Sequence, residues 1–253
     1  MTRLVADKEF WLAGLRADGA AVRAAVREAD LAAPVPSCPG WTVTDLVDHL
    51  AGVYGFVCRH LVRGTTATPD PADRPTRPAG GDPRAWWDER FAELVPLLEQ
   101  TPPDLPAWNW APRARTAAFW FRRMAHETAI HRWDAQFATV NAEPIDARLA
   151  ADGIAEVLDT WLPAGRGRHP DAPAGVVALH DRDSGYVWYA RLRGDGGIAL
   201  LDTGTLFDSA EHHERAAAEG RASDILLALY GRVGFDVLDL TGDERLLHGL
   251  RTG

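Results

Sequence analysis

The sequence predicts two domains of different class, a helical bundle followed by a smaller α+β domain. As far as about residue 163, apolar residues recur at helical spacing and proline-rich connections separate the runs. After Gly165 the apolar runs become short and β-prone, with turns between them. We therefore expect a helical domain over residues 1–163 and an α+β domain over residues 164–253.

The helices of the first domain carry start and stop signals. Thr42, with Asp45 three residues later, is typical of a capping box, and an apolar stripe follows that Gly64 ends. Asp82 and Pro83 indicate an N-cap and a proline in the first turn of another helix. The predicted helices of this domain cover residues 7–31, 42–64, 82–102, 116–138 and 146–163.

The second domain shows strand patterns before its helices. The predicted strands cover residues 176–179, 186–192, 198–201 and 237–240, and the predicted helices cover residues 222–233 and 244–250. The acidic, histidine-containing stretch 208–220 shows no clear period and receives no assignment.

Composition restricts the possible partners. The formal charge is −9, and Lys8 is the only lysine among 27 basic residues. We therefore expect no nucleic-acid partner, no Schiff-base chemistry and no Walker-type phosphate loop. The 2 cysteines are too few for a secreted disulfide framework, and no apolar run is long enough for a signal peptide or a membrane span. We expect a cytoplasmic protein without a membrane partner, and the sequence carries no signal for an oligomeric state.

One helical segment carries a pattern typical of a metal site. Glu127 and His131 are four residues apart and share one helix face, whereas His126 points away from both and is not expected to be a ligand. A carboxylate on an inner face needs a cation or another strong partner, and a metal would meet that need. His49, at the edge of the apolar stripe of helix 42–64, is the best candidate for a third ligand. Two histidines and one carboxylate suit catalytic zinc, and also non-haem iron(II). The alternatives are a solvated Glu–His pair and a core histidine.

Two stretches resemble the signature blocks of a known family. Residues 35–50, beginning VPSCPGWTV, and residues 124–134, MAHETAIHRWD, resemble blocks of the mycothiol-dependent maleylpyruvate isomerase family, whose first domain is a DinB-like metal-binding four-helix bundle. The resemblance implies metal ligands at His49, Glu127 and His131, which coincide with the site argued from spacing.

The C-terminal part resembles the second domain of the same family, which is similar to the sterol-carrier fold. Residues 222–232 resemble its helix ending in Gly-Arg, and residues 240–243 its closing turn. By position, the resemblance implies that Arg232 is catalytic, holds a substrate carboxylate and faces the metal; the alternative is an arginine that caps its helix. Residues 212–219 depart from the β-type run of the family and leave the local sheet in doubt.

The resemblance implies an enzyme that uses zinc and the thiol mycothiol. Zinc lowers the pKa of a bound thiol, and the thiolate adds to the double bond of a small electrophile, permits rotation and leaves again. The resemblance is equally consistent with transfer of the thiol to the electrophile. The alternatives are a binding protein for a metal or an apolar ligand, and a metal-dependent hydrolase without thiol. We also expect Asp134 to accept a hydrogen bond from the ring nitrogen of His131 that does not bind metal; the alternative is a solvated or arginine-paired Asp134. We interpret Cys38 as a small residue in the loop before helix 42–64 and Cys58 as a residue that packs within that helix.

Overall fold

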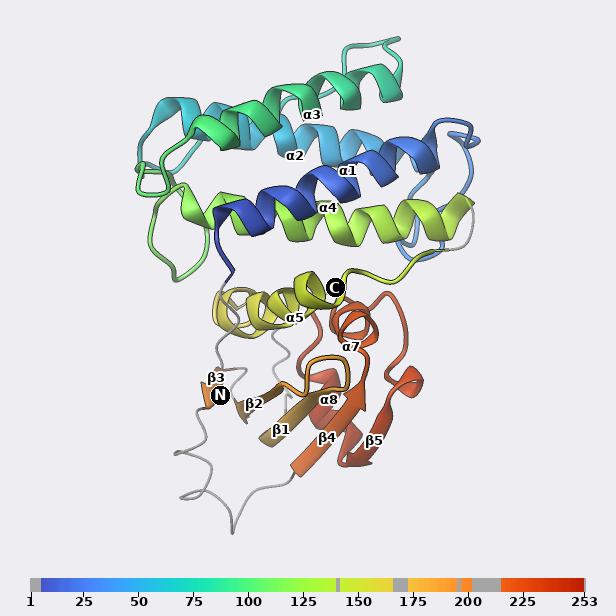
Figure 1. Ribbon diagram of the computed structural model, residues 1–253, viewed down its shortest axis with the longest axis vertical. Helices are drawn as coiled ribbons and strands as arrows, with labels where there is room; N and C mark the ends of the chain where they lie inside the picture. Colours follow the sequence, from blue (N-terminus) through green and yellow to red (C-terminus); the bar gives the residue numbers. More distant parts are fainter. Residues whose placement is uncertain (1–5, 140–141, 166–172, 195–196, 202–214, 253) are drawn as a thin grey trace. The chain divides into compact units, whose positions relative to one another are not determined.

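The computed structural model describes residues 6–139, 142–165, 173–194, 197–201 and 215–252. The chain divides into two compact units, Met1–Glu143 and Pro144–Gly253 (Figure 1). The first is helical and the second holds a mixed sheet with helices, so the predicted fold class is confirmed. None of the helices described is both long and apolar enough to span a membrane.

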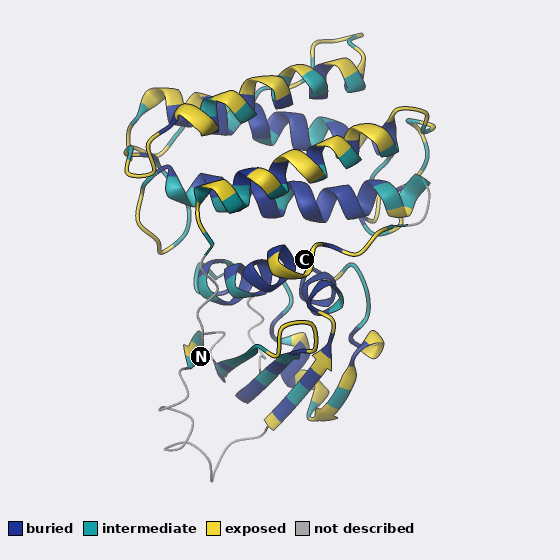
Figure 2. Ribbon diagram, in the orientation of Figure 1, coloured by how far each residue is buried: buried dark blue, intermediate teal, exposed yellow. Residues whose placement is uncertain are grey.

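The first unit is a bundle whose described residues form four α-helices. α1 packs against α4 and α3, and α2 packs against α3 and α4. The bounds are Lys8–Val26 for α1, Val43–Arg63 for α2, Pro83–Gln100 for α3 and Ala118–Thr139 for α4. Figure 2 shows that α2 and α4 are the most deeply buried of the four. A side chain on the facing surfaces of α2 and α4 is therefore shielded from water.

The ends of α2 follow from the residues that predicted them. The Thr42 side chain accepts a hydrogen bond from the Asp45 backbone N–H, and the Asp45 carboxylate accepts one from the Thr42 N–H at 2.8 Å. Gly64 ends the helix with φ 57°, a left-handed conformation that a residue without Cβ adopts at little cost. Buried Tyr54 and Thr128, whose hydroxyl oxygens lie 2.7 Å apart, join α2 to α4.

The second unit contains a five-stranded sheet in the order β3-β2-β1-β4-β5. β1 and β4 are parallel, and the other neighbouring pairs are antiparallel. The bounds are Ala174–Asp181 for β1, Val187–Arg193 for β2, Ile198–Leu201 for β3, Arg215–Gly220 for β4 and Asp239–Gly242 for β5. Helices α7, Ala222–Leu229, and α8, Glu244–His248, pack against β1 and β4.

The boundary between the units lies earlier than residue 163. α5, Ala147–Glu156, was expected to close the bundle, but it belongs to the second unit, where it packs against α7. A π-helical turn, Val157–Trp161, continues α5. The sequence of an amphipathic helix shows which of its faces is apolar, but not which element that face packs against. The pattern of α5 was therefore compatible with either unit.

The segment that departs from the family pattern is a strand where it is described. β4 pairs in parallel with β1, with Ala216 opposite Val177, and buries Ala216 and Ala218 on one face. Residues 208–214 of the unassigned stretch lie outside the described residues. The last strand begins at Asp239 instead of 237, because residues Phe235–Val237 form a 3-10 turn.

Candidate metal centre

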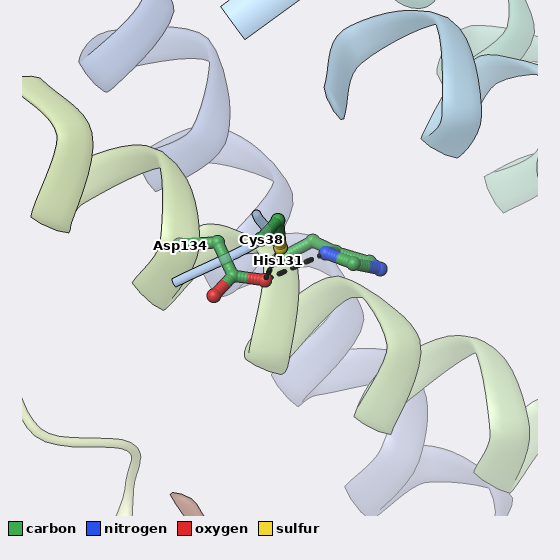
Figure 3. A group of neighbouring side chains, drawn as sticks. All are labelled: Cys38, His131 and Asp134. Atoms are coloured by element: carbon green, nitrogen blue, oxygen red, sulfur yellow. Dashed lines mark hydrogen bonds and ion pairs between the residues drawn. The ribbon is translucent and has the colours of Figure 1, made fainter. Parts of the chain in front are cut away.

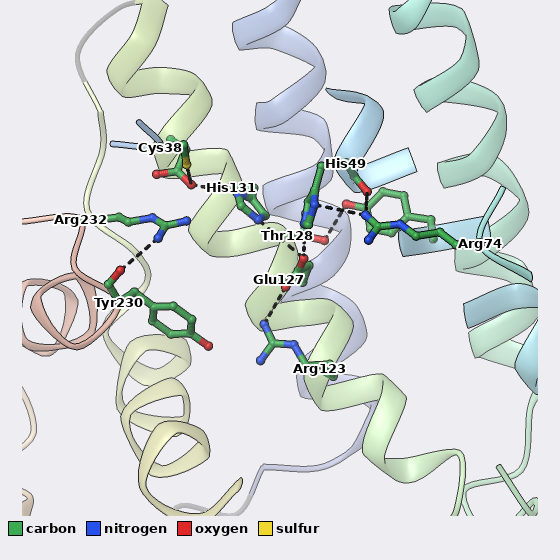
Figure 4. A network of polar contacts seen from close by, with 11 residues as sticks. Cys38, His49, Arg74, Arg123, Glu127, Thr128, His131, Tyr230 and Arg232 are labelled. Carbon is green, nitrogen blue, oxygen red and sulfur yellow. Dashed lines mark hydrogen bonds and ion pairs between the residues drawn. The ribbon is translucent and has the colours of Figure 1, made fainter. Parts of the chain in front are cut away.

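The bundle brings His49 of α2 together with Glu127 and His131 of α4 (Figure 4). His49 Nε2 lies 2.8 Å and His131 Nε2 lies 3.6 Å from the same oxygen, Glu127 Oε1. All three ligand atoms lie within 4.8 Å of one another. The side chains are 24%, 15% and 8% exposed in the order His49, Glu127, His131. Three metal-binding donors thus converge at a site that is shielded but still reached by solvent.

The donor set fits a divalent metal such as zinc. Tetrahedral zinc with bonds of about 2.0–2.1 Å separates neighbouring ligand atoms by about 3.4 Å. The separations of 2.8 and 3.6 Å from Glu127 Oε1 bracket that value, so small side-chain shifts suffice for coordination. Three protein ligands leave at least one coordination position for another molecule, as in catalytic zinc sites.

Burial and neighbouring charges shift the pKa values of Glu127, His131 and His49. Burial raises the pKa of Glu127, but hydrogen bonds from His131 and His49 and the charges of His131 and Arg123 outweigh it and hold the pKa well below its usual value. Burial lowers the pKa of His131, but contacts with Asp134, Cys38 and Glu127 raise it overall. The pKa of His49 is lowered, chiefly by burial. Glu127 is therefore a carboxylate anion at neutral pH.

Asp134 fixes the ring of His131, as predicted. His131 Nδ1 lies 2.8 Å from Asp134 Oδ2, and Asp134 is fully buried (Figure 3). A carboxylate only accepts, so Nδ1 carries a proton, and Nε2, which faces Glu127, is the ring nitrogen left for a metal once its own proton is released. This is the tautomer that a metal ligand bound through Nε2 requires.

Cys38, expected only as a small residue of the loop before α2, also belongs to this network. Its Sγ lies 3.4 Å from Asp134 Oδ2, so that oxygen lies between the thiol and the imidazole. Cys38, His131 and Asp134 also form a group with metal-binding side chains. All three are buried, and the hydrogen bond to Asp134 already engages His131 Nδ1. Of the two groups, the one that contains His49 is therefore the better candidate for a metal, whereas Cys38 and Asp134 contact the far side of the His131 ring.

Three further side chains of the centre escaped the sequence analysis. The Trp41 ring stacks on His131, with centroids 6.0 Å apart, and lies 4.9 Å from the His49 ring. Arg74 Nη2 lies 3.2 Å from His49 Nδ1. Arg123 donates to Glu127 Oε2 at 3.1 Å. The spacing of four between Arg123 and Glu127 was a local signal for the last contact, whereas the other two join different segments of the chain.

His126 and Arg232 were also considered in the sequence analysis. His126, one position before Glu127, is fully buried and is not a member of the donor group, as expected. Arg232 belongs to the second unit, where it follows the end of α7, and its Nη1 donates to the Tyr230 carbonyl at 3.0 Å. Gly231, with φ 69°, turns the chain there.

Comparison with known proteins agrees with this arrangement. Residues 12–136 match the family model "Mycothiol maleylpyruvate isomerase N-terminal domain", and residues 148–249 match "MDMPI C-terminal domain". The chain belongs to the mycothiol maleylpyruvate isomerase family. The limits of the two matches also agree with a division near Glu143. No curated protein matches the chain significantly.

Two solved structures share the fold of this family member over nearly its whole length. The crystal structure of the mycothiol-dependent maleylpyruvate isomerase is 19% identical, with a TM-score of 0.65, and covers 95% of this chain and 96% of its own. A variant of that enzyme, with one histidine replaced by alanine, is 18% identical, with a TM-score of 0.66 and the same coverage. At this level of identity the likeness establishes the fold.

Proposed function

We propose that this chain is a metal-dependent enzyme that uses mycothiol to attack a small electrophile. The reaction is a cis/trans isomerisation of the maleylpyruvate type or a transfer of the thiol to the electrophile. The observation that carries the proposal is the convergence of two imidazole nitrogens and one carboxylate oxygen within 4.8 Å, in a chain that both family models match. This is the ligand set of zinc sites that retain an open position.

The metal supplies one kind of chemistry: it lowers the pKa of a thiol that binds it, so that thiolate is present at neutral pH. The residues of the chain prepare the centre for that role. Glu127 supplies a negative charge, and Asp134 holds the His131 ring in the tautomer needed for coordination through Nε2. Trp41 covers the rings of both histidines and restricts the access of water.

Arg232 is the proposed residue for the carboxylate of the electrophile. A guanidinium offers five N–H donors in one plane, a geometry that suits a two-point contact with a carboxylate. In the isomerisation, the thiolate adds to one carbon of the activated double bond and the electron pair moves into the conjugated carbonyl. Rotation about the resulting single bond and loss of the thiolate then give the trans product.

Metal analysis followed by assays with and without mycothiol tests the proposal. We expect about one zinc per chain in the purified protein, and turnover of maleylpyruvate or a related electrophile only when thiol is present. Free thiol is counted after each reaction. Isomerisation returns all of the thiol, whereas transfer consumes one thiol per product. Turnover that needs metal but no thiol indicates a hydrolase and contradicts the proposal, as does a purified chain that binds no metal.

Substitutions on α2 provide the matched control. His49→Ala removes a proposed ligand and is expected to abolish both metal binding and turnover. His60 lies on the same helix, buried among the rings of Phe56, Trp108 and Trp120. His60→Phe is expected to retain metal and activity, so loss in both variants would indicate general damage to the bundle. Arg232→Ala is expected to abolish turnover and retain metal.

The proposed setting of the reaction follows from its reagents. The partners are mycothiol and a small-molecule electrophile, and neither Cys38 nor Cys58, both buried, forms a disulfide. Reduced cysteines suit the reducing cytoplasm, where we propose that the enzyme works.

A further inference from the structure

Three residues of α4 repeat at intervals of one helical turn. Arg123, Glu127 and His131 are each four positions apart, so they line one face of the helix. Glu127 stands in the middle, with the guanidinium on its N-terminal side and the imidazole on its C-terminal side (Figure 4). The helix itself thus brings a cation and a metal-binding ring to the same carboxylate.

The two oxygens of Glu127 have different partners. Oε1 faces His49 Nε2 at 2.8 Å and His131 Nε2 at 3.6 Å. Oε2 accepts a hydrogen bond from Arg123 Nη2 at 3.1 Å. A metal placed among the three ligands therefore meets Oε1, while Oε2 is already engaged.

The contact with Arg123 is strong enough to constrain the carboxylate. Arg123 is 3% exposed, and a hydrogen bond between charged groups in such a shielded place is among the stronger contacts in a protein. To chelate a metal through both oxygens, Glu127 would have to rotate and give up this bond. Arg123 would then be left as a buried cation without that anion, which is costly.

We infer that Arg123 is a positioning residue that restricts Glu127 to coordination through one oxygen and so keeps a position on the metal open for the thiol. This inference rests on the proposed function, because it presupposes a metal at His49, Glu127 and His131. It also implies that the site binds metal less tightly than it would without Arg123. Arg123 keeps Oε2 of Glu127 from the metal and places a positive charge near the metal cation.

Cobalt substitution provides a readout that does not depend on activity. Co²⁺ occupies zinc sites, and its visible absorption weakens when the coordination number rises above four. In Arg123→Met, both oxygens of Glu127 are free to bind, so the absorption is expected to weaken and the affinity for zinc to rise about tenfold. Thiol-dependent activity is expected to fall about 10–100-fold, mainly through a higher KM for thiol.

Two variants accompany Arg123→Met. Arg123→Lys keeps a cation beside Oε2 and is expected to restore most of the cobalt spectrum, even if the methionine variant folds poorly. Arg132→Met removes another buried arginine of α4, whose Nε bonds Asp18 at 2.9 Å, and is expected to leave the cobalt spectrum unchanged.

The outcomes separate this inference from the proposed function. If the unaltered chain binds neither Zn²⁺ nor Co²⁺, the proposed function fails and the inference with it. If the unaltered chain binds metal, an Arg123→Met variant with an unchanged cobalt spectrum and weaker zinc binding overturns the inference alone. That result would mean that Arg123 only supports the packing of α4.

Discussion

The buried side chains of α4 and α7 differ in polarity. α4 of the bundle buries charged and polar side chains, among them Arg123, His131, Arg132 and Asp134. α7 of the second unit buries an almost wholly apolar set, Ala222, Ser223, Ile225, Leu226, Leu227, Ala228 and Leu229. Most residues of each helix are buried, so burial alone does not distinguish a helix that carries a candidate site from one that only packs.

The buried side chains of the two helices are stabilised in different ways. On α4, Arg123 contacts Glu127, His131 contacts Asp134, and Arg132 contacts Asp18 at 2.9 Å. The attraction within such a pair offsets little more than the free energy lost when its two charges leave water. The pairs therefore contribute less to stability than apolar residues of the same volume would. On α7, burial of hydrocarbon stabilises the unit directly. The buried polar side chains of α4 are therefore better explained by a functional site than by a contribution to folding stability.

The largest effect is expected for Glu127→Gln, which removes the central charge of α4 at nearly constant volume. Arg123 loses the anion at Oε2, so the metal-free protein is expected to lose about 3 kcal/mol of unfolding free energy. Metal affinity is expected to fall more than about 100-fold. Urea unfolding and competition with a chromophoric chelator measure the two effects. Metal affinity within tenfold of the unaltered chain would contradict the assignment of Glu127.

Leu226→Ala tests the apolar side of the comparison. Leu226 is fully buried, and the cavity left by the substitution is expected to cost about 2–5 kcal/mol of stability. Because α7 supplies no ligand, metal affinity is expected to remain unchanged under conditions in which the variant is folded. Thermal unfolding and metal titration check this prediction, and a parallel loss of metal would break the distinction between the helices.

Asp134→Asn is expected to weaken metal binding about 10–100-fold, because an amide no longer dictates the tautomer of His131. Asp48→Asn is the matched control. Asp48 precedes His49 in the chain, but its carboxylate pairs with Arg77 at 2.8 Å. Chelator competition should show a change for the first variant alone, and equal losses in both would assign no special role to Asp134.

Cys58 gives the smallest effect, from a buried ionisable group that lies outside the metal centre. Burial, aided by the charge of Glu93, raises the pKa of the thiol to about 12, whereas an unfolded thiol titrates near pH 8.5–9. Above that pH the unfolded chain releases a proton that the folded chain keeps, so stability falls as pH rises. Between pH 8 and 10 the loss is about 1.5 kcal/mol. Urea unfolding of Cys58→Ala should show a pH dependence weaker by that amount; an identical dependence would contradict the raised pKa.

Features that depend on residues close together in the chain could be predicted from the sequence, and those that depend on distant contacts could not. The capping box of Thr42 and Asp45 acts over three residues, and its prediction was confirmed. Glu127 and His131 could be proposed as ligands from the sequence because they lie one turn apart on α4, and His49 because it borders an apolar stripe and the family resemblance points to it. The compact units of the structure divide after Glu143, whereas the sequence predicted a division after residue 163, because the period of α5 does not reveal which unit it packs against.

By itself, the sequence determined the helices, the order of the two domain types, the family and the three candidate ligands, because periodicity, caps and short motifs are local properties of the chain. Only the tertiary structure decided that one oxygen of Glu127 faces both histidines, that Cys38 reaches Asp134 and that β4 joins β1 in parallel. Cys38 and Asp134 are separated by 96 residues, and no local pattern encodes which distant side chains meet. Those contacts depend on the packing of whole elements, which is the outcome of folding.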